Sequence, residues 1–100
     1  MKDLKKIERE QAWIGDAVLA LFSRQWILLN EKKMDAEMFT RMTSNHFLNS
    51  LGNPTQVEVT IGRIFEKEGL EKSFNYIEKE LIPLFLRQKK NRIRKAGGKR

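Results

Sequence analysis

Two acidic residues, Asp16 and Glu58, lie in surroundings where a carboxylate is unfavourable. Asp16 belongs to residues 11–28, QAWIGDAVLALFSRQWIL, which are almost entirely apolar or small. Glu58 lies between two valines, one helical turn before Gly62. A buried carboxylate destabilises a fold unless a hydrogen bond, a cation or a metal ion compensates it. These two positions are therefore the first candidates for chemistry.

A shared pocket for both acids would have a specific requirement. Close carboxylates repel each other unless one is protonated or a cation lies between them. Oxygen ligands without a nearby histidine or cysteine are typical of Mg²⁺, with Mn²⁺ as a further possibility. The residues also allow a plainer interpretation, in which each acid lies at the solvent edge or pairs with Arg24 or Arg63.

The apolar spacing predicts helices that could position these acids. We expect four helices, over about 6–29, 35–51, 53–69 and 70–86, in a single compact all-α domain. Asn53 and Pro54 are typical of a helix start, and Pro83 should kink the last helix or shift its end. Gly62 lies within a helix, which suggests a close helix approach beside Glu58. The predicted apolar stripe of the first helix comprises Ile7, Ile14, Val18, Leu21 and Leu28.

Composition narrows the class of protein. A chain of 100 residues suits one domain with a modest core. The absence of cysteine excludes disulfides and thiolate metal sites and fits a reducing compartment, so a cytoplasmic location is expected. The charged N-terminus does not resemble a signal peptide. Since the long apolar run contains Asp16 and Arg24, a buried helix is expected rather than a membrane span.

Positive charge is concentrated at the C-terminus. Residues 87–100 carry eight lysines or arginines and no acid, whereas the rest of the chain has twelve bases and thirteen acids. We therefore expect a helical domain over 1–86 and a basic, flexible tail over 87–100. Such a tail suits phosphate contacts with nucleic acid. The candidate RNA-binding residues are Arg87, Lys89, Lys90, Arg92, Arg94 and Lys95.

Three segments together resemble the catalytic domain of ribonuclease III. WIGDAVLAL (13–21) resembles the family's Gly-Asp-Ala-Val helix, and TRMTSNHFL (40–48) resembles the helix that follows it. VEVTIGRIFEKEGLEKSF (57–74) resembles the second signature, Glu-Ala-x-Ile-Gly. The segments occur in the family's order. The closest likeness is to the minimal branch called Mini-III, which has no double-stranded RNA-binding domain.

The resemblance implies a Mg²⁺-dependent endoribonuclease that cleaves double-stranded or structured RNA, including ribosomal RNA precursors. It implies that Asp16 and Glu58 are catalytic metal ligands and that the protein is a homodimer. Full-length family members carry further acids at the positions of Ala12 and Thr55, whereas the Mini-III branch has alanine and threonine there. The segment between Asn45 and Glu58 is also shorter here than in either branch.

Two alternatives stay open, of which these departures favour the first and the three ordered segments disfavour the second. The first is a catalytically inactive ribonuclease III-like protein that binds RNA or the ribosome. The second is a helical interaction module with a nucleic-acid-binding tail.

His46, the only histidine, is expected to be structural. Asp35 and Glu37 lie near a family acid position but are displaced by one residue. Three aromatic residues lie off the predicted stripe of the first helix and are candidates either for the core or for a dimer interface: Trp13, Phe22 and Trp26.

Overall fold

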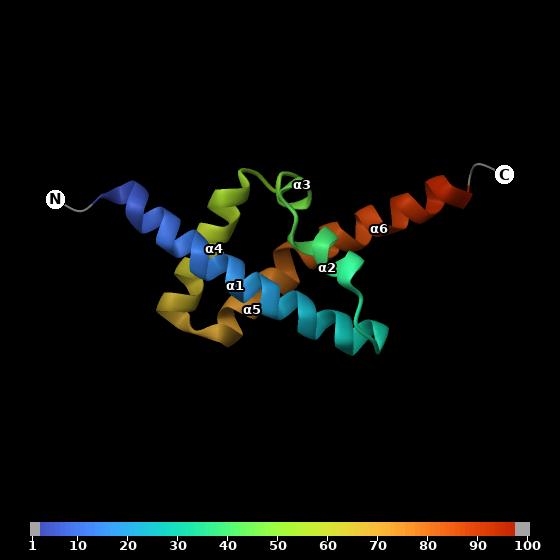
Figure 1. Ribbon diagram of the computed structural model, residues 1–100, viewed down its shortest axis with the longest axis horizontal. Coiled ribbons are helices and arrows are strands. Elements are labelled where there is room, and N and C mark those ends of the chain that lie inside the picture. The colour runs from blue at the N-terminus through green and yellow to red at the C-terminus, as the bar shows by residue number, and fades with distance from the viewer. Residues whose placement is uncertain (1–2, 98–100) are drawn as a thin grey trace.

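Six helices make up the regular structure of residues 3–97, the part of the chain described by this computed structural model; side chains are described for residues 3–93. Figure 1 shows a long central helix with the others packed along it and the last helix extending away from the body. No strand occurs within residues 3–97, so the predicted all-α class is confirmed. In order, the helices are α1 (Leu4–Glu31), α2 (Ala36–Thr43), α3 (Asn45–Leu48), α4 (Pro54–Glu68), α5 (Leu70–Glu80) and α6 (Ile82–Gly97).

The long helix α1 begins and ends with clear local structure. The Asp3 side chain caps it by accepting hydrogen bonds from the backbone N–H groups of Lys5 and Lys6, and Lys32 ends it in the left-handed conformation, with φ 61°. By length and apolar composition α1 could cross a membrane, a test that core helices also pass. Here its buried side chains contribute to a core that all six helices share.

Two predicted helices are each divided in two. The segment predicted over 35–51 breaks at Ser44, whose extended backbone ends α2 and whose hydroxyl accepts a hydrogen bond from the Phe47 N–H. The last predicted helix breaks at Leu81 because Pro83 has no N–H to donate to the carbonyl four residues earlier. The helix that follows runs through Gly97, so the predicted boundary between domain and tail at residue 86 lies inside α6.

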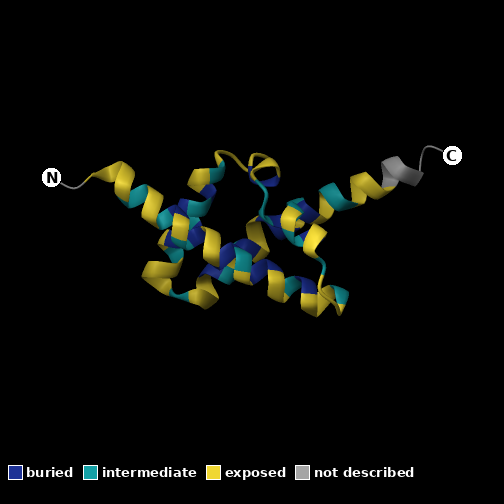
Figure 2. Ribbon diagram, viewed as in Figure 1, coloured by how far each residue is buried: buried dark blue, intermediate teal, exposed yellow. Residues whose placement is uncertain are grey.

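The buried side of α1 (Figure 2) agrees with the predicted stripe in part, since Val18 is buried and Ile14 packs against the core. Leu21 and Leu28 were expected to face inward, but they are 40 % and 50 % exposed. The small residues Ala12 and Gly15 are buried instead, because they lie against α4. The buried hydrophobic cluster comprises Val18, Leu19, Phe22, Ile27, Met38, Met42, Phe47, Leu48, Val57, Ile61, Ile77, Leu81, Ile82 and Phe85.

The closest helix approach is a glycine-lined crossing of α1 and α4. A Cβ atom at Gly15 would lie 1.8 Å from the carbonyl oxygen of Glu58, and one at Gly62 would lie 2.0 Å from the carbonyl oxygen of Gln11. Real Cβ atoms do not approach oxygen so closely, so only glycine fits at either position. Gly15 and Gly62 therefore face each other at the point where the two helices cross. The close approach predicted at Gly62 is confirmed.

We predict that Gly15→Ala and Gly62→Ala each lower the free energy of unfolding by about 3 kcal/mol or more, since the methyl group would force two backbones apart. Alanine at an ordinary helix position would instead be stabilising by about 1 kcal/mol. Urea denaturation measures the effect. Asn75→Ala, on an exposed position of α5, is the matched control and should be neutral or stabilising. Stabilisation by either glycine substitution would contradict the close crossing.

Candidate carboxylate site

The α1–α4 crossing brings Asp16 and Glu58 together. Their carboxyl groups are within hydrogen-bonding reach, although the residues are far apart in the chain. Gly15 precedes Asp16 directly, and the carbonyl of Glu58 itself lies over Gly15. The missing side chain at residue 15 is thus what lets the two acids meet. The juxtaposition predicted from the sequence is therefore present.

A second contact fixes the same helix pair nearer the start of α1. The side-chain amide of Gln56 donates a hydrogen bond to the Glu8 carboxylate over 3.2 Å. At the N-terminus of α4, Asn53 caps the helix by accepting from the Gln56 N–H, with Pro54 as the first helical residue. This cap sets where α4 begins and hence where Glu58, one turn later, is placed.

The environment of Glu58 favours its protonated form. Burial raises the pKa of Glu58 most, and the neighbouring Asp16 carboxyl adds to the rise by hydrogen bonding and by charge repulsion. Together these effects raise the pKa from its ordinary 4.5 to about 7. Near neutral pH the pair therefore holds, for part of the time, a proton that a bound cation would replace.

The plainer interpretation of these acids is correct in part, because Asp16 is exposed and Glu58 is half-buried at the solvent edge, but neither pairs with an arginine among the described residues. Arg24 lies over the ring of Phe39, 4.2 Å from its centroid, in a cation–π contact. Within residues 3–93, the ion pairs join Arg41 to Glu37 and Lys89 to Glu31, and neither involves the two acids. Asp16 and Glu58 thus share their site with each other rather than with a basic side chain.

The donor set suits an ion that needs few protein ligands. No group of three or more His, Cys, Asp or Glu side chains that could hold a metal occurs among the described residues. Mg²⁺ commonly binds through one or two carboxylates and completes its shell with water and substrate phosphate oxygens. Two adjacent carboxylates fit that pattern, and they do not fit an all-protein cage for zinc or calcium.

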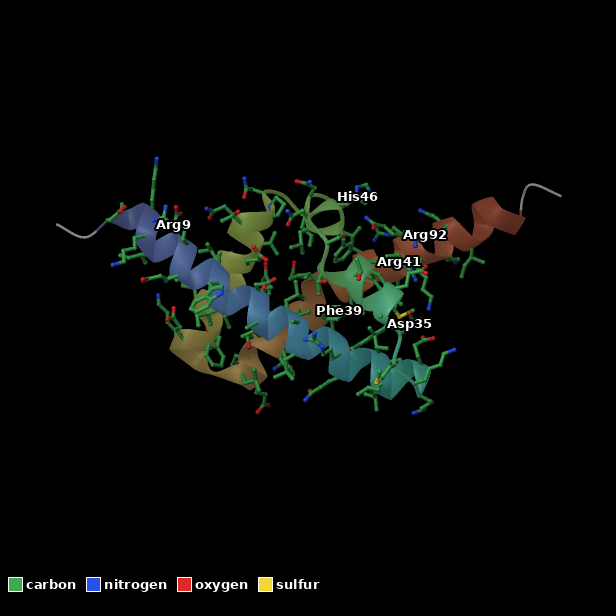
Figure 3. All side chains as sticks on the ribbon, viewed as in Figure 1. Arg9, Asp35, Phe39, Arg41, His46 and Arg92 are labelled. Atoms are coloured by element: carbon green, nitrogen blue, oxygen red, sulfur yellow. The ribbon has the colours of Figure 1, made fainter. Side chains whose placement is uncertain are left out.

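The other acids considered from the sequence lie elsewhere. Asp35 caps α2, where its carboxylate accepts from the Met38 N–H over 2.9 Å, and Glu37 pairs with Arg41. Figure 3 shows Asp35 on the α2 side of the molecule. Both therefore have local structural partners and do not join the carboxylate pair.

The basic residues predicted to bind RNA divide between two sides of α6. Lys89 and Arg92 line a hollow beside α2 and α3, whereas Arg87 and Lys90 are exposed and, by helical spacing, point away from it. The side chains of two further predicted residues, Arg94 and Lys95, lie outside the described part of α6.

Two residues of this hollow, Arg41 and His46, were not predicted to bind RNA. They come from α2 and α3, where the residues form no basic run and give no motif to recognise. Helical spacing on α6 could have predicted part of the hollow from the sequence, since Phe85, Lys89 and Arg92 fall on one face.

The three aromatic residues of α1 have different fates. Phe22 is buried against Phe74, with ring centroids 5.2 Å apart, and Trp26 packs edge-to-face on Phe85 at 6.2 Å. Trp13 is 78 % exposed. Phe22 is thus a core residue, Trp26 is partly buried against the core, and Trp13 lies on the surface, where an interface residue could lie.

We predict that stability falls as the pH rises from about 4.5 to 7. Folded Glu58 retains its proton to a higher pH than unfolded Glu58, so this stabilisation is complete below the unfolded pKa and is lost as the pH passes the folded pKa. The loss should be on the order of 1–2 kcal/mol, because water that reaches Glu58 screens part of the effect.

Urea denaturation across this pH range measures the prediction. Glu58→Gln should remove the decline, whereas Glu66→Gln, on an exposed position of the same helix, should retain it. Parallel stability–pH curves for the wild type and Glu58→Gln would contradict the raised pKa of Glu58.

Comparison with known proteins identified no relative of this chain. No family model matches the chain, and no curated protein or solved structure matches it.

Proposed function

We propose that this protein is an endoribonuclease that uses Mg²⁺, or Mn²⁺, to hydrolyse phosphodiester bonds in double-stranded or structured RNA. The observation that carries the proposal is the meeting of Asp16 and Glu58 at the α1–α4 crossing. The resemblance of the segments around both acids to the ribonuclease III signatures supports the same activity. A cytoplasmic role in RNA or ribosomal RNA processing is part of this proposal.

In this proposal Asp16 and Glu58 hold the ion between them. The chemistry supplied by such an ion is neutralisation of phosphate charge and acidification of an attacking water molecule. The chain contributes position: backbone contact at Gly15 and Gly62 fixes the spacing of the helix positions that carry the two carboxylates. Such rigidity lowers the entropy lost on reaching the reactive arrangement.

The positions that carry further acids in full-length ribonuclease III are used differently here. Ala12 is buried in the face of α1 that packs on the core, and Thr55 is exposed in the first turn of α4. The proposal therefore rests on two carboxylates, a number that the resemblance to the Mini-III branch supports. This small donor set also favours a second candidate function, RNA binding without cleavage by a ribonuclease III-like or ribosome-associated protein.

RNA would be held chiefly through its backbone. Arg87, Lys89, Lys90 and Arg92 are spread along α6 and can neutralise phosphates. A-form RNA exposes its sequence poorly in its deep major groove, so recognition by shape and backbone is expected. Binding should accordingly be weakened by salt and show little preference for sequence.

We predict that the protein cleaves a labelled RNA duplex with Mg²⁺ and not with excess EDTA. Asp16→Asn and Glu58→Gln should each reduce cleavage by more than about 100-fold, because even residues that merely support metal ligands contribute 10–100-fold. Gel electrophoresis of the products measures the rate. The matched controls are Glu10→Gln and Glu66→Gln, exposed acids on the same two helices, which should cleave like the wild type.

Three outcomes distinguish the candidate functions. Cleavage by the wild type and controls but by neither site variant supports the nuclease. Binding of the duplex without cleavage by all of these proteins supports the non-catalytic alternative. Failure of the wild type to bind RNA would contradict both and leave a helical interaction module.

A homodimer is part of the proposal. Trp13, Ala17, Leu21 and Leu28 are all exposed and follow one another at helical spacing along the outer face of α1. An apolar stripe of this kind is typical of a surface that a partner helix covers. A second copy of the chain would bury it.

We predict that Trp13→Ser shifts the protein toward the monomer, since Trp13 contributes the largest exposed side chain of the stripe. Sedimentation velocity measures the change. Lys72→Ser, on an exposed position of α5, is the control. A wild type that sediments as an 11.8 kDa monomer at micromolar concentration would contradict the dimer.

A further inference from the structure

We infer that the hollow between α2, α3 and α6 is a second, non-catalytic binding site for phosphates of the RNA backbone. This inference rests on the proposed function for its choice of RNA as the polyanion. The hollow is lined by Arg41, Ser44, His46, Phe47, Phe85, Gln88, Lys89 and Arg92. Figure 3 shows Arg41, His46 and Arg92 where these three helices meet.

Residues from separate parts of the chain build this hollow. On α6, Phe85, Gln88, Lys89 and Arg92 are spaced by three, one and three residues, which places them on one helical face. Arg41 comes from the last turn of α2 and His46 from α3. The site therefore forms only when α6 packs on the α2–α3 segment.

The charges in the hollow favour an anion. Three cationic side chains and one imidazole line it, and no carboxylate does. Glu37 and Glu31 pair with Arg41 and Lys89 from outside it and offset part of their charge, whereas Arg92 is in no ion pair among the described residues. A guanidinium has five N–H donors, so one carboxylate leaves donors of Arg41 for a further ligand.

Rigid contacts hold the hollow in shape. The rings of Phe47 and Phe85 meet edge-to-face at its floor, 5.6 Å apart. The Ser44 hydroxyl donates to the Arg41 carbonyl at 3.1 Å and accepts from the Phe47 N–H at 3.1 Å. Preorganised donors bind an anion with a smaller loss of side-chain entropy than freely moving surface cations.

A further hydrogen bond joins the two walls. The Gln88 amide donates to the Ser50 hydroxyl at 2.9 Å, which ties α6 to the segment that follows α3. The hollow lies apart from the α1–α4 crossing, toward the other end of the molecule (Figure 1). One ligand that occupies both places must be extended, as an RNA strand is, and an isolated phosphate ion could not do so.

His46 provides a direct reporter, because it is the only histidine in the chain. The untagged protein should be titrated in EDTA, which prevents metal-dependent cleavage, with a short RNA duplex and separately with inorganic phosphate. The imidazole proton resonances of His46 should shift saturably with RNA. Asp16→Asn should show the same shift, because that residue belongs to the other site.

Affinity measurements give the second test. Arg41→Gln/Arg92→Gln should weaken duplex binding at least about tenfold at about 100 mM salt and reduce the slope of log affinity against log salt by about 2. Lys67→Gln/Lys72→Gln, at exposed positions of α4 and α5, removes the same charge and should change affinity less than about twofold. Circular dichroism checks that both variants fold, and Arg41→Lys/Arg92→Lys should restore most of the affinity.

The outcomes separate this inference from the nuclease proposal. Equal affinities of the two double variants, or RNA binding that leaves the His46 resonances unmoved, would overturn the site. Saturable shifts with inorganic phosphate but none with RNA would also overturn it, since the hollow would then take only a small anion. RNA binding that depends on Arg41 and Arg92 without any cleavage would support the site and overturn the nuclease.

Discussion

Backbone contact between α1 and α4 is the constraint on which the rest of the molecule depends. At Gly15 and Gly62 the two main chains touch with no side chain between them. Each glycine is unfavourable for its own helix by about 1 kcal/mol relative to alanine. The close approach stabilises the pair through packing of the neighbouring apolar residues. It also sets the separation of the backbone positions of Asp16 and Glu58.

That contact places two acidic side chains, Asp16 and Glu58, next to each other. The raised pKa of Glu58 records the conflict, since burial and Asp16 both oppose its ionisation. Raised pKa values caused by neighbouring acids are common at sites where a protein binds a cation or transfers a proton. The apolar core formed by α1, α4, α5 and the shorter helices offsets this local strain.

The sequence predicted the acids and most helix starts, because both depend on local features. Asp35 and Asn53 cap helices as expected, and Pro54 occupies a first helical position. The buried side of α1 was predicted less well, because leucine at residues 21 and 28 outweighed the small residues. Small side chains are buried here by backbone approach, which hydrophobic periodicity does not register. The breaks at Ser44 and Leu81 depend on a single cap and a single missing N–H, and the apolar pattern runs through both.

The outer part of α6 has a consequence for how this protein responds to its ionic surroundings. Residues 87–92 carry four cations and no acid, and several are three residues apart, where like charges oppose the helix. One of these cations, Lys89, has an acidic neighbour in Glu31 at 3.6 Å. Added salt screens this repulsion, so ionic strength should stabilise the helix while it weakens polyanion binding. A bound polyanion would also stabilise the helix, because it neutralises these charges. Helix order and polyanion binding should therefore increase together.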